Sequence, residues 1–555
     1  MFQEKRRASL VGWMLVGTVW VLWLSCVPLR TRSPEDSIGP LGKPPTVEPE
    51  PRARPAKPVL EPAAAVTPAV GLTTGPLEIA VLDAILTSLE NNRALRVERL
   101  NPPIMRTLEQ EQRALFDPVL SGQFTETRVR SQRLARATTG TESMITETES
   151  ADALLRTFLP TGTTVDLEGG LQRTKSSLYF FPFASMRGGV TVTQALLRGF
   201  GIGVNLATLR QARLDTLTSQ YELRGFAEAL VAQIEQTYWD YALAQRQIEI
   251  FENSLRLADQ QLRETEERIN VGKLAETELA ATQAEVALRR EGLINARSTL
   301  AQTRLQLLRL LNVQGTDPWD QEIVLRNQPM VPDVVMDEVG THVKLALRMR
   351  PELNQARLAI QRGELEIIKT KNGLLPRLDF FGTLGKTGYA SSMREAYNAL
   401  DQDTYDTAYG FALEYPLGNR RPLALHKRAI LSRDQAEEAL NNLVQLVDVD
   451  VRSAYIEVNR AKEQVTATSA TRQLQEETLR AETEKFRVGK STTLLVAQAQ
   501  RDLLASQISE VDAVVNYLKA LVEFYRLEGS LLERRGIAAP GREPVNPFAR
   551  PTWWK

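Results

Sequence analysis

Side chains that could carry out chemistry are few in this chain of 555 residues, and they lie far apart. The sequence contains two histidines, His342 and His426, and one cysteine, Cys26. A histidine-based triad or a multi-histidine metal site needs partners that two distant histidines lack. A single cysteine forms neither an intrachain disulfide nor a zinc-binding cysteine cluster. These residue types argue against an enzyme, and we expect no metal site and no cofactor.

Two other patterns exclude further classes of function. The glycine-rich segment 199–203 looks superficially like a phosphate-binding loop. A P-loop also needs a Lys-Ser or Lys-Thr pair between a strand and a helix, and this segment lacks that pair. Basic and acidic residues balance at 68 each, so the composition leaves no electrostatic footprint for nucleic acid. We expect no nucleic-acid partner.

The most informative pattern is a duplication. Tyr238 and Gly272 lie 34 residues apart, as do Tyr455 and Gly489, and one offset of 217 residues relates the two pairs. Each glycine is the centre of a Val-Gly-Lys tripeptide. The two tripeptides are Val271-Gly272-Lys273 and Val488-Gly489-Lys490. A duplicated unit of this size indicates internal symmetry.

Each of these glycines is flanked by a heptad pattern. Apolar residues such as Ile234 and Tyr241 recur every seventh position, and the second copy departs from this period at Arg472 and Glu510. A seven-residue period over several heptads predicts helices packed as in a coiled coil. The first helix, from about residue 205 to 270, would be ~100 Å long. Because glycine adopts the left-handed conformation that ends a helix, each copy is predicted to be a helical hairpin with glycine at its tip.

Shorter alternating segments lie upstream of each hairpin. An offset of 258 residues relates Pro118 to Pro376, and alternating residues that are typical of strands follow both prolines. The spacing from proline to the tyrosine of the hairpin is 120 residues in the first copy and 79 in the second. The first copy therefore has 41 extra residues in its strand region, and we expect them to add a hairpin of strands.

The N-terminal region has the pattern of a secretory signal. Three basic residues at 5–7 precede an apolar run over 10–24. Cys26 is a weak match to a lipidation site, because Trp23 occupies a position where an aliphatic residue is usual. No other stretch is apolar enough, for long enough, to form a membrane-spanning helix. The predicted division is a signal peptide or anchor (1–32), a Pro-rich linker (33–77), a first repeat (78–315), a connector (316–335), a second repeat (336–535) and an irregular tail (536–555).

The duplicated set of motifs resembles the TolC family of outer-membrane efflux proteins. Residues 268–272 and 277–279 are similar to the first hairpin tip of that family, and residues 486–489 and 493–495 are similar to the second. The segments 194–199 and 414–418 resemble the family's strand-to-helix junctions.

The resemblance implies a mainly α fold with a small β part. Duplicated long helical hairpins would form a trimeric α-barrel in the periplasm, joined to a β-barrel that three protomers share in the outer membrane. The implied function is that of a passive channel-tunnel in a tripartite efflux or type I secretion system. Its implied partners are two further copies of the chain, a periplasmic adaptor, an inner-membrane transporter and outer-membrane lipid.

The same resemblance assigns roles to the hairpin tips. It implies that an adaptor docks at the two tips, through Val271, Gly272, Lys273, Val488, Gly489 and Lys490. Glu278 is the candidate gate residue at the periplasmic entrance, whereas Val496 stands where family members often have an aspartate. A purely structural interpretation stays open, in which the glycines cap helices and Glu278 is a solvated acid in the first turn of a helix.

Two other functions also stay open at this point. One is a structural coiled-coil tether in the periplasm, anchored by residues 10–25; the paired alternating segments argue against it. The other is a periplasmic adaptor subunit, a class that carries one hairpin and not two hairpins 217 residues apart.

Overall fold

The computed structural model describes residues 76–134, 141–177, 180–272, 274–312 and 319–546. The predicted signal or anchor, Cys26 and almost all of the Pro-rich linker lie outside these residues, as does Lys273. No helix among the described residues is both long and apolar enough to cross a membrane.

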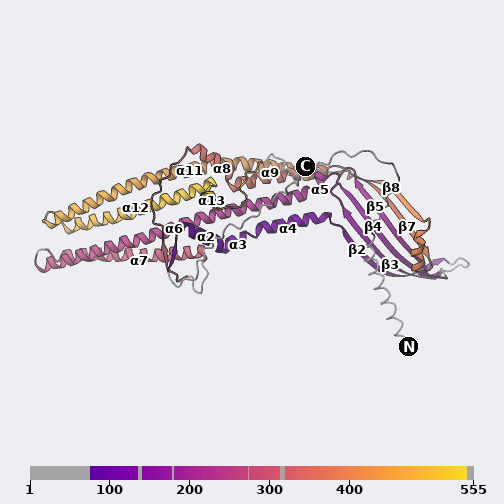
Figure 1. Ribbon diagram of the computed structural model, residues 1–555, viewed down its shortest axis with the longest axis horizontal. Coiled ribbons are helices and arrows are strands. Elements are labelled where there is room, and N and C mark those ends of the chain that lie inside the picture. The colour runs from indigo at the N-terminus through magenta and orange to yellow at the C-terminus, as the bar shows by residue number, and fades with distance from the viewer. Residues whose placement is uncertain (1–75, 135–140, 178–179, 273, 313–318, 547–555) are drawn as a thin grey trace, which may run out of the picture. The chain divides into compact units, whose positions relative to one another are not determined.

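Two long helical hairpins dominate the structure (Figure 1). The first consists of α6 (Ala207–Asn270) and α7 (Thr277–Leu311), and the second of α11 (Arg420–Arg487) and α12 (Thr493–Glu528). With 64 and 68 residues, α6 and α11 extend for about 100 Å at 1.5 Å per residue. The predicted long helices are therefore confirmed.

Shorter helices precede the strands in both repeats. The first repeat has α2 (Val81–Asn91), α3 (Arg93–Glu98) and α4 (Asn101–Arg113), and the second has α8 (Val339–Met349) and α9 (Pro351–Asn372). Helices α2 and α8 are related by the offset of 258, but the single helix α9 corresponds to two helices, α3 and α4. Pro102 and Pro103 explain the break, because proline is tolerated in the first turn of a helix and not in its interior.

The remaining short elements connect these parts. They are η1 (Ala114–Phe116), α5 (Ile202–Asn205), α10 (Met393–Asn398), η2 (Ala399–Asp401) and α13 (Leu531–Arg534). Helix α4 ends five residues before Pro118, and η1 fills most of the interval.

One six-stranded antiparallel sheet has the strand order β2-β3-β4-β5-β7-β8. Its strands are β2 (Val119–Leu134), β3 (Thr141–Phe158), β4 (Thr163–Ser176), β5 (Phe183–Ala195), β7 (Arg377–Ala390) and β8 (Tyr405–Glu414). The first repeat thus contributes four strands and the second two, so the predicted extra hairpin is confirmed as β3 and β4. Because β5 leads directly through α5 into α6, the sheet and the hairpin tips lie at opposite ends of the same long helices (Figure 1).

A second, two-stranded sheet was not predicted. Strand β1 (Leu77–Ile79) pairs in parallel with β6 (Ile323–Leu325), which lies in the connector between the repeats. The Tyr238 hydroxyl donates to the Ile79 carbonyl at 3.2 Å, and the Tyr241 hydroxyl donates to the Ile323 carbonyl at 3.1 Å. The tyrosines of α6 therefore hold this small sheet against the first hairpin.

The largest apolar core lies where the shorter helices pack against the long ones. Tyr238, Phe524 and Leu353 are fully buried in it and come from α6, α12 and α9. Residues 536–546 contain no helix or strand, yet hydrogen bonds hold them to α6 and α9. One of these bonds joins the Gln361 amide to the Asn546 carbonyl at 2.8 Å.

Candidate functional site

Both hairpin tips have the same backbone geometry. Gly272 and Gly489 each have a φ of +75°, and each donates its N–H to a carbonyl three residues earlier. A Cβ added to either glycine would meet no atom within 4 Å, so the conformation, and not crowding, is what favours glycine there. The neighbouring Val271 and Val488 are 66% and 67% exposed.

The predicted tip residues therefore share one surface at each turn. Lys490 is exposed beside Gly489, whereas Lys273 lies outside the described residues. Apolar valines are uncommon on isolated turns, and their exposure at both tips leaves a small apolar contact surface. The structure places the two tips alike, and it leaves their partner to be proposed below.

The residues just beyond the two tips differ. Glu278 is half-buried in the first turn of α7, and no ion pair or hydrogen bond of its carboxylate occurs in the described part of the chain. The equivalent position in the second tip is Leu495, which is 46% exposed. Val496, where relatives often have an aspartate, is only 4% exposed and packs inside the hairpin. An acidic group at the entrance would therefore come from the first tip.

One contact connects the ends of the two hairpins. The Arg268 guanidinium, in the last turn of α6, lies 4.6 Å from the ring centroid of Phe486, in the last turn of α11. A cation over an aromatic face at this distance is attractive by about 0.5–1 kcal/mol at an exposed site.

The two exceptions to the heptad pattern belong together. Arg472 on α11 and Glu510 on α12 form an ion pair of 2.6 Å across the second hairpin. Both residues also line a polar cavity of about 400 Å³ where α6 meets the second hairpin. The equivalent positions of the first hairpin are Leu255 and Leu293, so one pair of leucines is replaced by one pair of opposite charges.

The six-stranded sheet has two chemically different faces. Side chains alternate between the faces of a strand, so the strand register identifies which residues share a face. One face carries apolar residues from every strand, and most of them are solvent-exposed in the isolated chain. They include Leu120, Phe124, Leu155, Leu167, Val190, Val192, Phe380, Leu384, Tyr409, Phe411 and Leu413.

The opposite face is mostly polar and carries a row of ion pairs. Arg187 on β5 binds Glu168 of β4 at 3.2 Å and Asp406 of β8 at 2.7 Å. To reach Asp406 it crosses β7 at Gly385, where a Cβ would lie 2.7 Å from an Asp406 oxygen. A side chain at this position would therefore displace the ion pair.

The added hairpin is seated on the glycine-rich segment 199–203. The turn between β3 and β4 bonds to it through Gly201, whose N–H donates to the Thr161 carbonyl at 3.2 Å. Gly199 and Gly201 have φ values of +88° and +98°. A Cβ on Gly162 of the turn would lie 2.3 Å from the Gly199 carbonyl oxygen. The segment is thus a strand-to-helix junction, as its resemblance implied.

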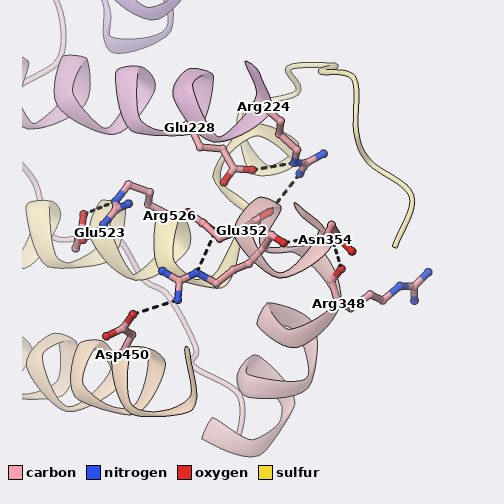
Figure 2. A network of polar contacts seen from close by, with 10 residues as sticks. Arg224, Glu228, Arg348, Glu352, Asn354, Asp450, Glu523 and Arg526 are labelled. Carbon is pink, nitrogen blue, oxygen red and sulfur yellow. Dashed lines mark hydrogen bonds and ion pairs between the residues drawn. The ribbon is translucent and has the colours of Figure 1, made fainter. Parts of the chain in front are cut away.

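A buried polar network joins the repeats at the level of the apolar core (Figure 2). On α6, Arg224 binds Glu228 at 3.0 Å, and its other end binds Glu533 of α13 at 2.6 Å. Arg350, which precedes α9, binds Asp450 of α11 at 3.1 Å. Burial raises the pKa of the Glu228 carboxyl from 4.5 to about 7, and the Arg224 charge opposes that shift only in part.

Several of these residues had no role in the sequence analysis. The polar row around Arg187 could be found only from the strand order, because Asp406 is 219 residues away. Apolar alternation in β4 and β8 is the signal that points to a two-faced sheet, and it is visible in the sequence. The burial of Glu228 has no such signal, because a heptad pattern records only the apolar positions.

Comparison with known proteins agrees with this architecture. The sequence model of the outer membrane efflux protein family matches residues 148–313 and 342–530, which is more than half of the chain. A curated relative is the alkaline protease secretion protein AprF of Pseudomonas aeruginosa, 23% identical over 317 residues. That alignment covers 56% of this chain and 63% of the relative, slightly less than two thirds of its length.

Solved structures of low sequence identity share the fold. The outer-membrane channel OprN has a TM-score of 0.62 and 17% identity over 81% of this chain and 90% of its own. The CmeC outer membrane channel of Campylobacter jejuni has a TM-score of 0.61 and 13% identity over 83% and 87% of the two chains. Given the duplicated hairpins, the two-faced sheet and the match of both repeats to the family model, this chain belongs to the outer membrane efflux protein family.

Proposed function

We propose that three copies of this chain form a passive conduit through which cargo leaves the cell across the outer membrane. The observation that carries the proposal is the arrangement within one chain of an exposed apolar sheet face at one end of the long helices and exposed hairpin tips at the other. Family membership places the protein in the outer membrane, with its helical part in the periplasm.

The sheet supports a position in the lipid. Its apolar face includes Tyr409, Phe411 and Leu413, which are 83%, 69% and 70% exposed. Contiguous apolar surface of this kind is unfavourable in water and favourable against hydrocarbon. The opposite face, with Arg187, Glu168 and Asp406, would then line a water-filled passage.

The tips support a periplasmic partner. We propose that the exposed valines beside Gly272 and Gly489 dock against an adaptor that connects the conduit to an inner-membrane transporter. In this arrangement the transporter supplies the energy, and the chain itself catalyses no reaction. The name of AprF favours a protein cargo as one candidate, and small molecules are the other.

Two measurements test the conduit. The protein purified in detergent should be a trimer, and it should conduct ions in planar lipid bilayers. A monomer, or fractionation with the inner membrane, would overturn the proposal and would favour the tether.

A third measurement tests the tips separately. Replacing both Val271 and Val488 with serine should impair export in cells and leave trimer formation and bilayer conductance unchanged. The matched control is Ile294→Ser, an exposed apolar residue on α7 away from the tip that is 67% exposed. Unimpaired export with both tips changed would remove the docking role.

A further inference from the structure

Both outer edges of the six-stranded sheet are unpaired in the single chain. These edges are β2, which follows the shorter helices of the first repeat, and β8, which leads into α11. Unpaired edges are sites where another strand can add. Because the sheet has an even number of antiparallel strands, β8 of one copy runs antiparallel to β2 of the next. Copies can therefore join into one continuous antiparallel sheet.

The chain already contains a junction of the same kind. Inside the sheet, β5 ends the strands of the first repeat and pairs with β7, which begins those of the second. The repeat offset of 258 relates β7 to β2, since Pro376 corresponds to Pro118. The strand-to-helix junctions relate β5 to β8 by an offset of 221, since Ala195 corresponds to Pro416. The pair β5–β7 is thus a template for a pair β8–β2 between copies.

We propose that each copy joins the next in the register of this internal template, which closes three sheets into one of eighteen strands. The inference rests on the proposed trimer and specifies its interface. Thr191 faces Thr383 in the template, with their hydroxyl oxygens 3.1 Å apart. Applying the two offsets places Ala412 of one copy opposite Thr125 of the next.

The chemistry of the two faces supports this register independently. In it, Leu413 of one copy lies opposite Phe124 of the next, and both belong to the apolar face. A shift by one residue would place apolar side chains of β8 beside polar ones of β2. The offsets were taken from prolines and junctions outside the strands, so they carry no information about the faces.

The helices beside the strands support it as well. Within the chain, Leu214 of α6 and Leu358 of α9 belong to one buried apolar cluster. Their equivalents are Leu431 of α11 and Leu100 before α4, which are 58% and 59% exposed. In the proposed register, α11 of one copy lies beside α4 of the next. The two exposed leucines would then cover each other.

The register can be tested by disulfide cross-linking in the full chain with Cys26→Ser. The pair Thr125→Cys and Ala412→Cys should oxidise to covalent dimers and trimers. Two register controls keep Ala412→Cys and move the second cysteine two residues along the same face, to Gln123 or Thr127. As a geometric control, Thr191→Cys with Thr383→Cys should form the same bond inside one chain. Cross-linked species are read on non-reducing gels.

The outcomes separate this inference from the proposed function. Cross-linking at least tenfold stronger for Thr125 than for either control supports the register. Stronger cross-linking at position 123 or 127, or none in an intact trimer, overturns the register and leaves the trimeric conduit standing. A protein that is monomeric before oxidation overturns both.

Discussion

The two repeats share their helical hairpins and differ in almost everything attached to them. The second repeat contributes two strands, has a leucine beyond its tip and contains the ion pair of Arg472 and Glu510. The first contributes four strands, has Glu278 beyond its tip and contains a buried acid, Glu228, where the second has the exposed Gln445. The comparison shows that the hairpin tolerates little change in length, whereas strands and single polar residues were free to diverge.

The largest expected effect breaks the seating of the added hairpin. Gly162→Ala places a Cβ against the Gly199 carbonyl at a residue with a φ of +89°. Backbone strain and overpacking together should cost roughly 2–6 kcal/mol. We expect loss of the heat-resistant trimer on gels. The control is Gly418→Ala at the second repeat's junction, where a Cβ has its nearest neighbour 3.9 Å away; equal loss in both variants would contradict the seating role.

The next effect makes the first repeat like the second at one buried position. Since the pKa of Glu228 is raised to about 7, the folded protein binds a proton more tightly than the unfolded chain does. Stability from this group is present below pH 4.5 and is lost as pH rises to about 7. Glu228→Gln should therefore remove that loss and raise the melting temperature above pH 7.

The measurement for Glu228 is the melting temperature as a function of pH. Glu477→Gln serves as the control, because Glu477 is an exposed partner of Arg480 on α11. An unchanged pH profile in Glu228→Gln would show that the carboxyl does not titrate in this range. A profile that also flattens in the control would assign the effect to net charge.

A smaller effect makes the second hairpin like the first. Arg472→Leu with Glu510→Leu copies the leucines at 255 and 293, and we expect it to be neutral or stabilising. Either single substitution leaves one charge without this partner, and should destabilise by about 1 kcal/mol because both groups are partly exposed. A double-mutant cycle of denaturant midpoints measures the coupling. Additive effects of the two substitutions would show that the pair contributes no stability.

The smallest effect concerns the entrance and involves no change in stability. Glu278→Gln should lower the preference for cations, and Leu495→Glu should raise it by adding the missing acid to the second tip. Reversal potentials in asymmetric salt across a planar bilayer measure the change. If both variants keep the wild-type potential, neither tip lines the narrowest part of the passage.

The helical half of the fold could be predicted from the sequence, because a seven-residue period and a glycine turn are local signals. The four-to-two division of strands followed from a spacing difference of 41 residues. The pairing of β1 with β6 could not be predicted, since three-residue strands carry no period. Arg472 and Glu510 were read as breaks in a seam. Their pairing became visible only when α11 and α12 were placed side by side.

The small sheet of β1 and β6 has a consequence for how the chain folds. Its strands pair Leu77 with Ile323, so the segment between them contains nearly all of the first repeat. Such a distant contact forms only after the intervening chain is ordered, because closing a long flexible loop is entropically unfavourable. Tyr238 and Tyr241 offer their hydroxyls to this sheet only once α6 exists. We expect amide exchange to protect α6 earlier than β1, which makes the pairing a late marker that the first repeat is complete.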